Sequence, residues 1–126
     1  MIEAILAIIN NELNKIGVPY EFMMWTSPVE DRYWVGEFSE TPTDTEDGCE
    51  EMTGLLTGTT SGTWESLLQD TTKIKDHFPS VGGLRVSTEQ GAVVIFYDNS
   101  FPVPTGEANL KRIQVNLNIK SWKGMS

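Results

Sequence analysis

The sequence predicts a single α+β domain, spanning residues 1–126, in which two helices pack on a mainly antiparallel β-sheet. Three observations favour this fold class. Two segments repeat their apolar residues with the period of an α-helix, and the segment before the C-terminus alternates apolar and polar residues. The expected strands also come in runs instead of alternating one by one with helices, which is typical of α+β domains.

The N-terminal region predicts a helix followed by two strands. Apolar residues recur at spacings of three and four over residues 1–16, and Gly17 is suited to end that helix. Strands are expected over residues 20–26 and 32–40, where aromatic residues are frequent. A turn over residues 29–31 would make these two strands antiparallel neighbours.

The middle of the chain predicts a third strand over residues 49–60 and a second helix over residues 63–78. Thr63 is a candidate N-cap, and Pro79 cannot continue the helix. The residues that we expect on the buried side of this helix share a helical spacing. They are Trp64, Leu67, Leu68, Thr71, Ile74 and Phe78.

The C-terminal third predicts a hairpin and a final strand. The segments "LRVST" and "AVVIFY" flank a turn that ends at Gly91, and a loop follows over residues 98–109. Over residues 112–120, apolar residues alternate with polar ones. This period of two indicates a strand with one face on the core and the other in water.

Composition and charge argue against several classes of protein. A net charge of −9 disfavours nucleic-acid binding, sequence-specific or not, because phosphate neutralisation needs clustered bases. No apolar run approaches the roughly 20 residues of a membrane span. Cys49 is the single cysteine, so it cannot form an intramolecular disulfide, and we expect it as a small buried or half-buried strand residue. The sequence therefore predicts a soluble, intracellular protein without a membrane partner.

The stretch "SETPTDTEDGCEE", residues 39–51, is the most acidic part of the chain. Its carboxylates are Glu40, Asp44, Glu46, Asp47, Glu50 and Glu51. An EF-hand loop built around Gly48 would keep only Asp47 as a ligand at a required position, so that motif fails. A solvated loop between strands is the favoured interpretation, and a looser site for a metal ion or small ligand is the alternative.

We assign no catalytic, cofactor-binding or metal-binding residue. His77 is the single histidine, and no G-x-S-x-G nucleophile elbow accompanies it. Its position in the last turn of the second helix is explained by the helix dipole. The stretch "GLLTGTTSGT" lacks the lysine of a phosphate-binding loop. The sequence therefore predicts a protein that is not an enzyme and uses no cofactor.

Charged residues and tryptophans are candidates for contacts between copies of the chain. The bases that follow the last acid are Lys111, Arg112, Lys120 and Lys123. They complement the acidic stretch in a head-to-tail contact, although a solvated surface explains the same pattern. Trp34 and Trp64 are expected in the core. Trp25 and Trp122 are the interface candidates, because tryptophan is enriched at protein interfaces.

The order of these segments resembles that of a family of phage structural proteins. The resemblance covers nearly the whole chain, through "MIEAILAIINNELNKIG", "VPYEFMMW", "YWVGEFSETPTDTEDG", "GLLTGTTSGTWESLLQDTTKIKDHF" and "RIQVNLNIKSW". A helix, an aromatic strand, a second strand, a threonine-rich strand, an amphipathic helix and an alternating strand follow in that order. The chain is thereby similar to the tail-completion or tail-terminator (head–tail joining) proteins of long-tailed phages and prophages.

The resemblance implies a function in assembly. Such proteins form a ring, usually a hexamer, that stops growth of the tail tube at its head-proximal end and joins the capsid connector. The implied partners are further copies of the chain, the tail tube protein and the head-completion or connector protein. The implied location is the host bacterial cytoplasm during assembly and then the neck of the virion tail. Another neck or minor tail protein is the alternative within this class.

Overall fold

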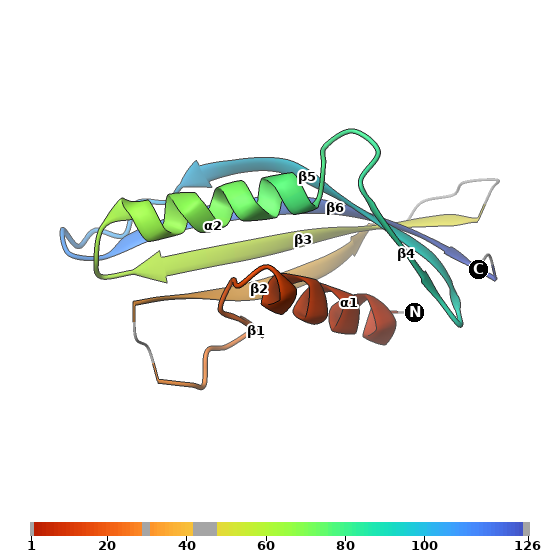
Figure 1. Ribbon diagram of the computed structural model, residues 1–126, viewed down its shortest axis with the longest axis horizontal. Helices are drawn as coiled ribbons and strands as arrows, with labels where there is room; N and C mark the ends of the chain where they lie inside the picture. The colour runs from red at the N-terminus through yellow and green to blue at the C-terminus, as the bar shows by residue number, and fades with distance from the viewer. Residues whose placement is uncertain (1, 29–30, 42–47, 125–126) are drawn as a thin grey trace.

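The computed structural model describes residues 2–28, 31–41 and 48–124 (Figure 1). The elements in these residues are α1 (Ile2–Lys15), β1 (Tyr20–Phe22), β2 (Arg32–Thr41), β3 (Cys49–Thr60), α2 (Trp64–His77), β4 (Leu84–Thr88), β5 (Gly91–Pro102) and β6 (Lys111–Lys123). The predicted order of a helix, three strands, a helix and three strands is confirmed. Both helices and the β4–β5 hairpin lie where the sequence predicts them. Thr63 precedes α2 as predicted, but its side chain makes no capping hydrogen bond.

The strands pair in one sheet in the order β1-β2-β3-β6-β5-β4. Every neighbouring pair is antiparallel except β1 and β2, which run parallel. The predicted antiparallel pairing of the first two strands is therefore wrong. The reason is that β1 ends early, at Phe22, so a long connection precedes β2, which begins at Arg32. Such a connection allows parallel pairing, whereas a tight turn joins only antiparallel strands. Residues 29–30 of the predicted turn lie outside the described residues.

The predicted fold class, an α+β domain on a mainly antiparallel sheet, is corrected to a mostly-β fold. Strands contain 47% and helices 25% of the described residues, and the mixed six-stranded sheet curls into a half-barrel within one small domain. The difference comes from strand length, because β5 and β6 contain 12 and 13 residues and are longer than predicted. In particular, β5 continues to Pro102, into the segment predicted as a loop. Long strands accumulate twist, which favours a curled sheet.

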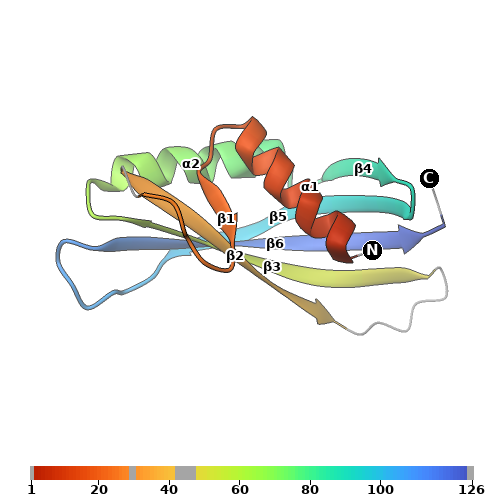
Figure 2. The same ribbon diagram turned by 90° about the horizontal axis from the view of Figure 1, so that it is seen from below.

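Both helices cover the same face of the sheet (Figure 2). Their buried residues join one apolar cluster with the inward-facing residues of the central strands. The alternation predicted for the last strand is confirmed, since Ile113, Val115, Leu117 and Ile119 of β6 are all buried. Trp34 of β2 is fully buried in the same cluster, as predicted. The outward-facing residues of β6 are more exposed and mostly polar.

Two glycines of β3 make room for aromatic rings of β2. Trp34 is paired with Gly58 and Phe38 with Gly54 in the register of these strands. A Cβ atom at Gly58 would lie 2.5 Å from Trp34 Cε2, and one at Gly54 would lie 2.9 Å from Phe38 Cε1. The rings therefore cover backbone that would otherwise be bare, an arrangement known as aromatic rescue of strand glycines.

Candidate interaction surfaces

The acidic stretch is only partly within the described residues. Asp44, Glu46 and Asp47 lie outside them. Glu50 and Glu51 lie on β3, where they face Lys123 at 3.5 Å and Lys120 at 4.0 Å in the same chain. Within the described part, no group of three or more histidine, cysteine, aspartate or glutamate side chains is arranged to hold a metal ion. Cys49, at the start of β3, is buried as predicted.

The four predicted interface bases separate into two pairs at opposite ends of β6. Lys120 and Lys123 lie at the C-terminal end, beside the acids of β3. Lys111 and Arg112 begin β6 at the other end, and neither forms an ion pair with a described residue. Among the described residues, Lys111 and Arg112 are thus the two predicted interface bases without an ion pair, and the contact of all four with another copy stays a prediction.

The predicted interface tryptophans are both half-buried. Trp25 stacks on Tyr33 of β2, with 5.7 Å between the ring centroids. Trp122 lies on β6 between Cys49 of β3 and Ala92 of β5 in the sheet register. Their proposed contact with another copy stays a prediction.

The carboxylate of Asp70 ties α2 to β2 and was not singled out from the sequence. Arg32 donates hydrogen bonds from Nε to Oδ2 at 2.6 Å and from Nη2 to Oδ1 at 3.0 Å. Trp34 Nε1 donates to Oδ2 at 2.8 Å. The hydrogen bonds that Arg32 donates to Asp70 raise the pKa of Arg32, against the lowering effect of burial. Asp70 is fully buried, which is tolerated because both of its oxygens have partners.

The position of Asp70 corrects the predicted buried stripe of α2. Leu67, Ile74 and Phe78 are fully buried, as predicted. Trp64 and Leu68, however, are exposed, so the prediction of a core position for Trp64 is wrong. The helix presents Asp70 to the sheet in their place because Arg32 and Trp34 provide the hydrogen bonds that the carboxylate needs.

A second polar contact joins the two helices. His77 Nε2 on α2 lies 3.0 Å from Glu12 Oε1 on α1, and Lys15 Nζ lies 3.0 Å from Glu12 Oε2. Burial raises the pKa of Glu12, but the hydrogen bonds from Lys15 and His77 outweigh it, so the pKa lies below its ordinary value. The single histidine is therefore placed in a contact between helices.

An exposed apolar patch lies at the β1 edge of the sheet. Its exposed members are Phe22, Met23 and Met24, with the half-buried Phe38 beside them, and we call it the β1 patch. Phe22 and Phe38 are 6.0 Å apart between ring centroids. The side chain of Met24 is 69% exposed, and those of Phe22 and Met23 are also well exposed. Exposed apolar patches often mark contact surfaces, so the β1 patch is a candidate for one.

An apolar groove lies between α2 and the end of β5. It encloses about 220 Å³, and its lining residues are Trp64, Leu68, Thr71, Ser100, Phe101, Pro102 and Ile113. We call it the α2 groove. Leu68 is 55% exposed although it is a large apolar residue in the middle of a helix.

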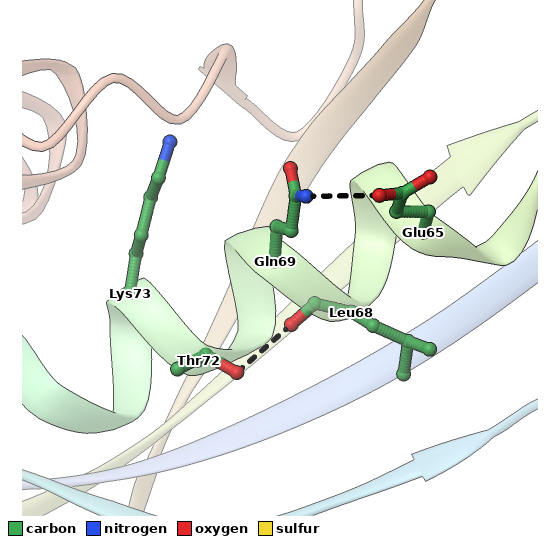
Figure 3. A pocket seen from close by; sticks show the side chains of 5 residues that line it. All are labelled: Glu65, Leu68, Gln69, Thr72 and Lys73. Carbon is green, nitrogen blue, oxygen red and sulfur yellow. Dashed lines mark hydrogen bonds between the residues drawn. The ribbon is translucent and has the colours of Figure 1, made fainter.

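A neighbouring depression runs along the outer side of α2. It is lined by Glu65, Leu68, Gln69, Thr72 and Lys73 (Figure 3). In Figure 3 the side chain of Leu68 points away from that of Lys73. Gln69 Nε2 donates to Glu65 Oε1 at 3.4 Å, so polar groups of this depression pair with one another along the helix. Leu68 therefore lies between the two hollows and lines both of them.

No protein-family model matches the chain, and no curated protein sequence matches it. Several solved structures share its fold, among them the following two. One, whose name states no function, is 13% identical with a TM-score of 0.74, and the match covers 100% of this chain and 99% of that one. The other belongs to a structure described as the virion of a native gene transfer agent particle. It is 9% identical with a TM-score of 0.61, and the match covers 86% of this chain and 83% of that one.

Proposed function

We propose that this chain is a structural protein of a phage-like particle, and more specifically a tail-completion protein that caps the tail tube and joins it to the head connector. The observation that carries the proposal is the fold likeness to a chain in a gene transfer agent virion, over most of both chains. The resemblance of the segment order to tail-completion and tail-terminator proteins supports the finer assignment.

The proposed activity is assembly and not catalysis. Its partners would be further copies of the chain in a ring, the tail tube protein and the connector, and its place would be the neck of the particle. A ring seated on the last layer of the tube occupies the surface that the next layer would need, and tube growth therefore stops. The exposed apolar residues at the two edges of the sheet support this proposal, because binding of other chains would cover them. Within the described residues, no helix has the length and apolar character needed to cross a membrane.

The proposal is tested by locating the chain in particles. An epitope tag at the C-terminus, with gold-labelled antibody and electron microscopy of purified particles, should place label at the head-proximal end of the tail. Particles purified from cells that lack the gene should show unjoined heads and tails of irregular length. Labelled particles with gold elsewhere, or normal particles without the gene, would contradict the proposal.

A further inference from the structure

The two exposed apolar features lie at opposite edges of the sheet. The β1 patch adjoins the first strand of the sheet order, and the α2 groove adjoins the part of β5 that continues beyond its pairing with β4. We propose that the β1 patch of one copy inserts into the α2 groove of the next copy, so that a second copy of this chain is the occupant of both. This inference rests on the proposed ring assembly and names the contact that would build it.

The apolar chemistry of the two features matches. Met23 and Met24 project from the edge with unbranched, flexible side chains, which fill irregular apolar hollows well. The groove offers a hollow of about 220 Å³ walled by the aromatic rings of Trp64 and Phe101. Sulfur–aromatic contacts between methionine and such rings are favourable.

The backbone of the β1 patch is held in a strained shape. Met23 has a φ of 66°, in the left-handed region that residues other than glycine and asparagine rarely adopt. A hydrogen bond from Met23 N to the carbonyl oxygen of Gly36, at 3.0 Å, holds it there. Backbone strain of this kind is found mostly at functional sites. Here the strained residue, Met23, exposes an apolar side chain to solvent.

Charges beside the two features are complementary. Glu40 follows Phe38 on the same face of β2 and begins the acidic stretch. Lys111 shares the face of β6 that carries Ile113 of the groove, and it has no ion-pair partner among the described residues. Arg112 lies on the opposite face, where its Nε donates to Thr59. Glu65 of α2 follows the groove residue Trp64 in the sequence, but it lines the neighbouring depression and not the groove. Insertion would therefore bring the acid Glu40 of one copy toward the base Lys111 of the next.

Unpaired strand edges accompany both features. β1 covers β2 only up to Gly36, so residues 37–41 of β2 have no partner on that side within the described part of the chain. β4 covers β5 only up to Ile95, and residues 98–102 likewise have none on the β4 side. Unpaired edges are surfaces on which another chain can add. A contact between two different edges is heterologous, and it propagates into a ring or filament instead of closing as a dimer.

Sedimentation velocity of purified chains tests the insertion. Met24→Glu changes the β1 patch, Leu68→Glu changes the α2 groove, and Val81→Glu is the matched control, because Val81 is 90% exposed and belongs to neither feature. The parent and Val81→Glu should associate alike. Met24→Glu and Leu68→Glu should each weaken association by roughly thirtyfold or more, as truncation of a central interface residue does.

Mixing the two interface variants gives a more specific test of the same contact. Met24→Glu keeps an intact groove and Leu68→Glu keeps an intact patch, so the mixture should form dimers of one copy of each and nothing larger. Association of either variant alone at the parent's strength, or a mixture that stays monomeric, would overturn the inference. A parent that is monomeric in solution but located in particles would overturn the inference and leave the proposed function standing.

Discussion

The helix-covered face of the sheet and its two edges treat large apolar side chains in opposite ways. On the face, Trp34, Leu56 and Leu117 are fully buried, and even a carboxylate, that of Asp70, is buried with all its partners. At the edges, Met24 and Leu68 remain mostly exposed. Folding of one chain therefore buries the apolar side chains of the face but leaves those at the edges exposed. We propose that neighbouring copies cover the edges.

The largest expected effect is on the buried face. Asp70→Ala would leave Trp34 Nε1 without an acceptor and Arg32 with only the exposed Asp31, at 3.7 Å, as an ion-pair partner. Removing one partner of a fully buried ion pair costs about 3–5 kcal/mol. The Arg32 side chain is 23% exposed, so the free energy of unfolding in urea should fall by an amount at the lower end of that range, about 3 kcal/mol. Glu50→Ala removes an exposed ion pair and should cost about 0–1 kcal/mol. Equal losses in the two variants would contradict the contrast between face and surface.

A smaller loss is expected where aromatic rings lie on strand glycines. Gly58→Ala would force Trp34 to move, because the added methyl would overlap its ring. Overpacking of a core costs about 1–3 kcal/mol, which denaturant unfolding would detect. The control is Gly62→Ala, whose added Cβ would lie no closer than 3.4 Å to its neighbours. Unchanged stability of Gly58→Ala would mean that the rings are not packed on the glycines.

The β1 patch predicts a variant in which stability and association change in opposite directions. Met23→Gly relieves a positive φ and should raise the free energy of unfolding by up to about 1 kcal/mol. It also removes an apolar side chain from the patch, so association should weaken. Thermal unfolding of dilute protein and sedimentation of concentrated protein measure the two effects separately. A variant that gains stability and keeps full association would remove Met23 from the contact.

The smallest effect concerns pH and the contact between the helices. The folded-state pKa of Glu12 is lowered, so its charged form contributes stability above the ordinary carboxyl pKa, and this contribution is lost as the pH falls through the folded value. Glu12→Gln should therefore be less stable than the parent at pH 7, by about 0.5–1 kcal/mol, and the difference should shrink in acid. Chemical denaturation at pH 7 and pH 3 measures it. A difference that is constant with pH would show that the charge of Glu12 is not responsible.

The periodic parts of the fold were predictable from the sequence. The alternation of β6 and the helical spacing of α1 identify elements whose one side is buried, because burial of one face imposes the period. The curl and class of the sheet were not predictable in this way. They depend on how far β5 continues and on the parallel pairing of β1, and both are set by long-range partners that local patterns do not report.

The candidate surfaces were only partly predictable. The acidic stretch and the four bases are visible in the sequence, but only the structure shows that Lys120 and Lys123 already lie beside acids of their own chain. Leu68 has the helical spacing of a core residue, but α2 turns Asp70 toward the sheet and leaves Leu68 exposed. Burial of an aspartate is not expected from its polarity. The available signal was that Arg32 and Trp34, two donors on one face of a strand, could receive a carboxylate.

The central claim is that the two exposed edges mediate the assembly that joins head and tail. Complementation of a particle that lacks this gene tests it most directly. The measurement is the fraction of particles with head and tail joined, counted by electron microscopy after expression of the parent, Val81→Glu, Met24→Glu or Leu68→Glu. The parent and Val81→Glu should restore joined particles, and the two edge variants should leave heads and tails apart although they fold normally. Joined particles at the parental frequency with Met24→Glu and Leu68→Glu would contradict the account.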